Sequence, residues 1–174
     1  MLKTVLTYGT IAGLIAGGAC FATTTLVPGH LPTLWGMALG YTTMLIALSA
    51  IFLAVKHTRD MTPDRRIGFW PALVIGLAIT LVAGLFYALG WELALLVNGG
   101  SDAFLDGYMA QRRAEGGDPA KLAADLEQMS VMRTRYRNPL FRIPVTFSEI
   151  APVGVLVSFV TAALLRNPRV LPTK

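Results

Sequence analysis

The chain has 174 residues and a mass of 18.7 kDa, with 54% hydrophobic and 14% charged residues and a mean hydropathy of +0.58. An average soluble domain is roughly 45–50% apolar and about 25% charged. The composition therefore excludes a soluble enzyme, a disordered tail and, because the chain has one cysteine, a disulfide scaffold. The formal charge of +5 would suggest nucleic acid in a soluble protein. In a chain this apolar we interpret it as a topology signal and expect no nucleic-acid partner.

Four continuous apolar runs follow one another along the chain. They cover about residues 4–27, 34–55, 70–97 and 141–165. A helix that crosses a hydrocarbon core of roughly 30 Å needs about 20 residues, so each run is long enough. A membrane β-barrel would instead show short alternating segments. We therefore predict an all-α integral membrane protein in a lipid bilayer, with four transmembrane helices in a single membrane domain over residues 1–174.

Turn-forming residues mark the expected ends of these helices. Pro28-Gly29 should end the first helix, and Pro32-Thr33 precedes the second. Thr62-Pro63 has the pattern of an N-cap followed by proline at the first helical position. Asn98-Gly99-Gly100 should end the third helix, and Asn138-Pro139 should begin the fourth.

The distribution of basic residues predicts the orientation. Residues 28–33 contain no Lys or Arg. The segment between the second and third runs contains four, namely Lys56, Arg59, Arg65 and Arg66. Because positive residues stay on the cytoplasmic side, we expect both termini in the cytoplasm and residues 98–138 outside.

A cleaved signal peptide is the competing interpretation of the first run. Lys3 precedes an apolar stretch that ends in small residues, and Cys20 raises the possibility of a lipoprotein. Gly17 and Gly18 stand where a lipobox has an aliphatic and a small residue. We therefore favour an uncleaved helix in which Cys20 is a small packing residue.

The outer segment, residues 98–138, has the pattern of two amphipathic helices. Ser101 can cap the first, Gly116-Gly117 should end it, and Asp118-Pro119 can begin the second. Apolar residues recur at helical spacing in both halves: Phe104, Leu105, Tyr108 and Met109, then Leu122, Leu126, Met129, Met132 and Tyr136. We predict an extracytoplasmic helical hairpin between the third and fourth spans. Its apolar faces can pack on its own bundle, which we favour, on the membrane surface, or on a protein partner through residues 101–137.

Small residues recur every four positions within three of the spans. Such stripes allow helix backbones to approach closely, which drives helix association in lipid. We expect them to pack the protein's own helices, with a homo-oligomer as the alternative. The stripes are Gly9, Gly13 and Gly17 in the first span, Gly36 and Gly40 in the second, and Ala72, Gly76, Thr80, Gly84 and Ala88 in the third.

Three ionisable residues fall inside the third and fourth runs, namely Glu92, Arg142 and Glu149. A charge at the bilayer centre costs at least about 2.5–3.5 kcal/mol, so these residues should face the bundle interior and pair, or become neutral. They form either a proton or cation site or a structural clamp between Arg142 and Glu92. Polar side chains on the spans should hydrogen-bond across helices, and those that could support the site are Tyr41, Tyr87 and Ser148.

A catalytic set is missing from the sequence. His30 and His57 are expected on opposite sides of the membrane, so they cannot share a metal or a triad. The chain has neither a Walker loop nor a dinucleotide fingerprint after a strand. We expect no catalytic residue, metal or cofactor, and a non-enzymatic accessory or interaction module. The alternative is a small ion- or proton-coupled carrier or channel using the three charges; a membrane enzyme acting on a lipid or quinone ranks third.

The fourth run contains the most specific pattern in the chain, supported by Gly40-Tyr41 and Met44 in the second run and by Lys3-Thr4-Val5-Leu6. The sequence resembles a family of small bacterial inner-membrane proteins catalogued as a domain of unknown function (number forty-one ninety-nine). The resemblance implies a four-helix protein of the bacterial inner membrane with no assigned activity, substrate or cofactor. The pattern itself is Asn138-Pro139-Leu140-Phe141-Arg142, Thr146-Phe147, Glu149 and Pro152-Val153-Gly154.

Overall fold

The computed structural model describes residues 1–26, 33–116, 118–168 and 170–171, and within these ranges it contains helices and no strand. The all-α class is therefore confirmed. The helices are α1 (Leu2–Leu26), α2 (Thr33–Leu48), α3 (Ala50–Asp60), α4 (Phe69–Val97), α5 (Gly100–Glu115), α6 (Pro119–Tyr136) and α7 (Pro139–Leu165). Four stretches of the described chain are long and apolar enough to cross a membrane: Leu2–Leu26, Leu34–Asp60, Phe69–Val97 and Pro139–Leu165.

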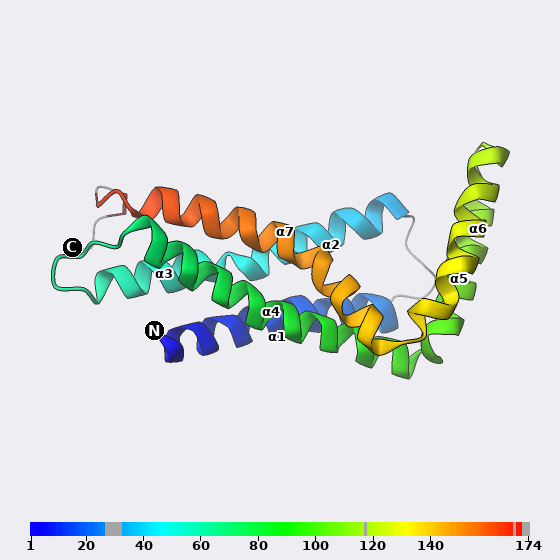
Figure 1. Cartoon of the computed structure of the whole chain (residues 1–174), viewed down its shortest axis with the longest axis horizontal. Helices are drawn as coiled ribbons and strands as arrows, with labels where there is room; N and C mark the ends of the chain where they lie inside the picture. The colour runs from blue at the N-terminus through cyan, green and yellow to red at the C-terminus, as the bar shows by residue number, and fades with distance from the viewer. Residues whose placement is uncertain (27–32, 117, 169, 172–174) are drawn as a thin grey trace.

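The long helices run side by side along the long axis of the molecule, and α5 and α6 lie across one end of them (Figure 1). Helix α4 packs against α1 on one side and against α7 on the other. Helix α3 contacts all three of these helices, whereas α2 packs less extensively. The start of α1 and the end of α7 lie at the end of the bundle opposite α5 and α6 (Figure 1).

The predicted helix ends at Asn98, Asp118 and Asn138 are confirmed. Asn98 follows the last residue of α4. The side chains of Asp118 and Asn138 each accept a hydrogen bond, at 3.0 Å, from the backbone N–H two residues later, at the starts of α6 and α7. The prediction for Ser101 was wrong: α5 begins at Gly100, after a left-handed Gly99 with φ of 87°, so Ser101 lies inside the first turn. The predicted turn residues Pro28, Gly29, Pro32 and Gly117 lie outside the described residues.

The second apolar stretch differs from its prediction at its C-terminal end. It continues as helix to Asp60, five residues beyond 55, and Ser49 between α2 and α3 keeps helical dihedrals (φ −58°, ψ −21°). The added turn is stabilised by the Lys56–Asp60 ion pair at 2.7 Å. Lys56 and Arg59 therefore lie on a helix and not in the connecting turn.

Thr62-Pro63 does not begin a helix, contrary to the prediction. The Thr62 hydroxyl donates to the carbonyl of Arg59 at 2.6 Å and accepts from the N–H of Arg66 at 3.1 Å. Its side chain therefore closes a turn after α3. Helix α4 begins six residues after Pro63, at Phe69, behind an extended Gly68.

The small-residue stripes of α1 and α4 pack within the chain, as predicted. A Cβ atom added at Gly90 would lie 2.5 Å from the carbonyl oxygen of Gly17, so the two backbones are almost in contact. A Cβ at Gly154 of α7 would lie 2.1 Å from Cγ2 of Thr80 on α4. The stripe of α2 differs, because a Cβ at Gly40 would meet nothing within 4 Å.

Candidate functional site

Glu92 and Arg142 form a bidentate ion pair between α4 and α7. Arg142 Nε donates to Glu92 Oε1 at 2.6 Å, and Arg142 Nη2 donates to Glu92 Oε2. The two side chains are 21% and 8% exposed, respectively. Paired planar groups of this kind give the strongest side-chain hydrogen bonds in proteins. The third guanidinium nitrogen, Arg142 Nη1, donates to the backbone carbonyl of Tyr136 at 2.8 Å, so every nitrogen of this buried cation has a partner.

Aromatic residues extend this pair to the two transverse helices. The guanidinium carbon of Arg142 lies 5.7 Å from the centroid of the Tyr136 ring at the end of α6. Trp91 of α4 donates from Nε1 to the Tyr136 hydroxyl at 3.0 Å and packs edge-on against Phe104 of α5, with centroids 4.8 Å apart. Burial raises the pKa of Tyr136 to about 12, so its hydroxyl stays protonated. The cluster Glu92, Trp91, Tyr136 and Arg142 thus joins α4, α6 and α7, and reaches α5 through Phe104.

Glu149 does not share in this ion pair. It lies seven residues beyond Arg142 on α7, which is about 10 Å along a helix. The Tyr87 hydroxyl of α4 donates to Glu149 Oε2 at 3.1 Å. The side chain of Glu149 is exposed, whereas Tyr87 is buried. The three predicted site residues therefore divide into a closed ion pair and a separate carboxyl group.

Of the three residues predicted to support the site, Tyr87 contacts one of its members, Glu149. Tyr41 projects from α2 with 48% of its surface exposed. The Ser148 hydroxyl donates to the carbonyl of Val145, on its own helix, at 2.6 Å.

The expectation that the threonine hydroxyls bond across helices was largely wrong. A threonine on a helix always has the carbonyl of the preceding turn within reach, so its hydroxyl donates to this local acceptor and not to another helix. Thr25 differs, since its hydroxyl accepts at 3.0 Å from Asn98, the residue that follows α4. Hydroxyls that donate within their own helix are those of Thr23, Thr24, Thr42, Thr43 and Thr80.

A cleft of about 590 Å³ lies beside these residues, between α1 and α2. Tyr87 and Trp91 of α4 line its side, and residues of α5, including Tyr108, line its outer end. Through Tyr87 the cleft adjoins the Glu149 carboxyl, and through Trp91 it adjoins the ion-pair cluster. Neither member of the Glu92–Arg142 pair lines it. Among the described residues, no group of three His, Cys, Asp or Glu side chains could hold a metal, and His30 lies outside these residues.

Sequence reasoning missed Arg59, which is 2% exposed at the opposite end of the bundle. Its Nη1 and Nη2 atoms donate to the carbonyls of Val170 and Leu171 at 2.8 and 2.9 Å, and its Nε to Asp60 at 3.2 Å. The pattern of basic residues identified Arg59 as a topology marker alone. Two of its partners are backbone carbonyls distant in the chain. Because every residue has a backbone carbonyl, the sequence does not indicate which ones accept a hydrogen bond.

The described residues form an all-helical fold in which four stretches are long and apolar enough to span a membrane. Its family is shown directly. The model of a family described as protein of unknown function (DUF4199) matches residues 11–167, and the chain belongs to this family. The resemblance drawn from the fourth apolar run is therefore confirmed. No curated protein and no solved structure matches the chain.

Proposed function

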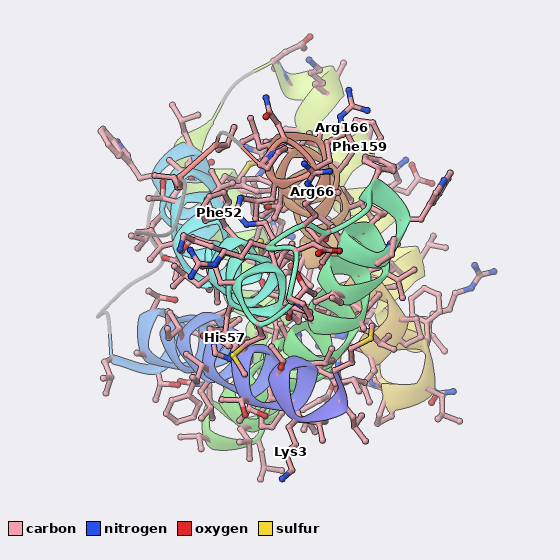
Figure 2. All side chains as sticks on the ribbon, turned by 90° about the vertical axis from the view of Figure 1, so that its left-hand side faces the viewer. Lys3, Phe52, His57, Arg66, Phe159 and Arg166 are labelled. Atoms are coloured by element: carbon pink, nitrogen blue, oxygen red, sulfur yellow. The ribbon has the colours of Figure 1, made fainter. Side chains whose placement is uncertain are left out.

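We propose that this protein is a multi-pass protein of the bacterial inner membrane, with both termini in the cytoplasm, and that it acts as a non-enzymatic accessory or interaction module. Figure 2 views the end of the bundle opposite α5 and α6, where Lys3, Arg66 and Arg166 are found. Basic residues favour the cytoplasmic side, so their position supports this orientation. The pair of helices α5 and α6 would then form an extracytoplasmic hairpin.

The observation that carries the proposal is the way α5 and α6 are held. Arg133 of α6 pairs with Asp102 and Asp106 of α5 at 3.0 and 2.9 Å. Near the other end of the pair, Arg112 of α5 bonds Asp125 of α6 at 2.8 Å. These contacts fix the two helices to one another.

Helix α6 is half-buried on one side and exposed on the other. All of its residues are described, and none of them is buried. Val131 is 69% exposed and stands beside the exposed Met132 and Arg135. A helix that is ion-paired to its neighbour and keeps one side exposed offers a preformed surface, which reduces the entropy lost on binding a partner.

The ion-pair cluster supports the clamp interpretation of Glu92 and Arg142. Arg142 contacts both the carbonyl and the ring of Tyr136, the last residue of α6. The cluster therefore connects the exposed helix pair to the apolar helices below it. With all its guanidinium nitrogens bonded to protein, Arg142 has a structural role that needs no substrate.

Photo-crosslinking in native membranes tests the proposal. A crosslinking amino acid replaces Val131 in the full chain, and Asp64, exposed in the turn at the opposite end of the bundle, is the matched control position. We expect a discrete product of one partner protein from position 131 and not from position 64. Adding Met132→Glu should remove this product, and deletion of 102–135 should abolish co-purification of the same partner. The absence of a discrete product, or identical products from both positions, would contradict an interaction module.

Glu149 supports a second candidate, an ion- or proton-coupled carrier or channel. Its exposed carboxyl lies near the middle of an apolar helix, where a charge is expensive and functional roles are common. The test is proton or cation flux into proteoliposomes containing the full chain. Glu149→Gln should abolish the flux, and Glu127→Gln, on the exposed surface of α6, should leave it unchanged. Equal flux in both variants contradicts this candidate.

A further inference from the structure

The side of the bundle between α1 and α2 is packed differently from the rest. Between α1 and α4, a Cβ added at Gly17 or Gly90 would meet backbone at 2.5 Å. On α2, a Cβ added at Gly40 would meet nothing within 4 Å, and Gly40 lines the cleft of about 590 Å³. That volume falls within the roughly 300–1,000 Å³ of small-molecule sites. The small residues of α1 and α4 allow another helix to approach closely, whereas those of α2 leave open space.

Polarity changes along the length of the cleft. Its inner part is lined by Ala16 of α1, Met44 of α2 and Tyr87 of α4, whose hydroxyl is bonded to Glu149. Its outer part, about 14 Å further along α1, is lined by Thr25 and Asn98 and is bounded by α5. A largely apolar interior, in which Thr43 and Tyr87 are the polar residues, leads to hydroxyl and amide groups, and this fits a molecule with an apolar chain and a hydrogen-bonding head.

The cleft also indicates the charge of that head. Among the described residues that line it, none is ionised at neutral pH. Neither Glu92, which is bonded to Arg142, nor Glu149, which accepts from Tyr87, lines the cleft. An anionic lipid head is recognised by Lys or Arg, and the described residues of the lining include neither. A neutral head matches the lining without leaving a buried charge unpaired.

From these observations we infer that the cleft binds one neutral amphipathic lipid, with its apolar chain along α1 and α2 and its uncharged, hydrogen-bonding head beside Thr25 and Asn98. Such a molecule would enter from the bilayer, and it would replace the helix contacts that α2 lacks on this side. This binding site is separate from the exposed surface of α6 and does not depend on the proposed interaction module.

Trp91 provides a direct measurement, because it lines the cleft. The other two tryptophans, Trp35 and Trp70, are exposed, so Trp35→Phe with Trp70→Phe leaves Trp91 as the one fluorophore of its kind. The full chain in phosphatidylcholine vesicles is titrated with a monoacylglycerol brominated on its acyl chain. We expect saturable quenching of Trp91, at about tenfold lower mole fraction than with phosphatidylcholine or phosphatidylglycerol brominated in the same way.

Two glycine variants then locate the binding site. Gly40→Leu places a side chain in the cleft, and we expect it to weaken the saturable quenching about tenfold or more. Gly18→Leu is the matched control, because Gly18 is exposed on α1, has the same open surroundings and does not line the cleft. It should leave the quenching unchanged.

Four outcomes would overturn the inference. Quenching that rises linearly with mole fraction and equals that by phosphatidylcholine means that bulk lipid fills the space. Tighter binding of phosphatidylglycerol means that the head is anionic. No quenching by any brominated lipid means that lipid does not enter. Equal effects of the two glycine variants place the site elsewhere, and if Gly40→Leu does not fold, the comparison of the three lipids decides alone.

Discussion

The contacts between the long apolar helices and the contacts at the two ends of the bundle depend on different forces. Helices α1, α4 and α7 approach one another through glycine and threonine, as at Gly17 with Gly90 and at Thr80 with Gly154. At the ends, arginines hold the structure: Arg142 where α5 and α6 attach, and Arg59 at the opposite end. The comparison shows that close packing of backbone and small side chains joins the apolar helices, whereas charged hydrogen bonds join the chain near the helix ends.

This division is the one expected if the bundle lies in a bilayer, as we propose. Lipid tails remove the hydrophobic driving force between helices, so close backbone approach and dispersion must hold them together. Charges are tolerated where each has partners for all its hydrogen-bonding atoms, and Arg142 and Arg59 both meet this condition. Breaking the two kinds of contact should therefore have different consequences.

The largest effect is expected from Glu92→Ala, because it leaves the Arg142 guanidinium buried without its carboxylate. Breaking a buried pair on one side costs about 3–5 kcal/mol of the free energy of unfolding. Unfolding of the detergent-solubilised protein by increasing SDS measures this change.

The double variant Glu92→Ala with Arg142→Met provides the control. Replacing a whole buried pair by apolar groups is often neutral, so most of the lost stability should return. If the double variant is as unstable as the single one, the ion pair itself contributes the stability, and the unpaired charge is not the cause.

The second largest effect is expected at the opposite end, from Arg59→Met. Hydrogen bonds to charged groups contribute about 1.5–3 kcal/mol, and here they hold the carbonyls of Val170 and Leu171. Loss of the guanidinium should release this segment, so that carboxypeptidase removes it faster, as measured by mass spectrometry. Arg66→Met, at an exposed position of the same end, is the control and should digest as the native chain does.

The sequence predicted the apolar helices better than the contacts between them. The third and fourth apolar helices were predicted as 70–97 and 141–165. The observed helices begin one and two residues earlier and end at the predicted residues. This agreement arises because hydropathy and the Asn98 and Asn138 signals are local. The end of the second span was missed, since the helical turn from Lys56 to Asp60 is polar and depends on the ion pair between them.

The candidate site was predictable in part. Charges in an apolar run are visible in the sequence, so Glu92, Arg142 and Glu149 were identified without the structure. Which of them pair depends on how α4 and α7 are rotated against each other, and periodicity does not determine that rotation. The cleft was not predictable either, because it arises where α2 fails to pack closely, and the glycines of α2 resemble those that do pack.

The third prediction tests the close backbone contact between α1 and α4 with Gly90→Ala. The added methyl group meets the Gly17 carbonyl at 2.5 Å, and backbone cannot move aside as a flexible side chain can. Overpacking of this kind costs typically about 1–3 kcal/mol, measured by the same SDS unfolding. Gly18→Ala adds the same methyl group in open space on α1 and should not lower the stability. Equal effects of the two alanines would mean that close approach is not what holds α1 to α4.

The smallest effect is expected for the exposed charges between α5 and α6, and it should depend on pH. Hydrogen bonds from Arg137 and then Arg133 hold the pKa of Asp102 below its ordinary value of 3.8. A lowered pKa in the folded state means that the contribution of Asp102 is fully present above pH 3.8 and is lost as the pH falls below it. Hydrogen exchange of α6, corrected for the intrinsic pH dependence, should therefore speed up below that pH, and Asp102→Asn should show the faster exchange already at neutral pH. High salt should reduce the difference between the native chain and this variant, because exposed pairs are screened, whereas it should leave the effect of Glu92→Ala largely unchanged. If salt weakened both effects equally, the contrast between buried and exposed charges at this end of the bundle would not hold.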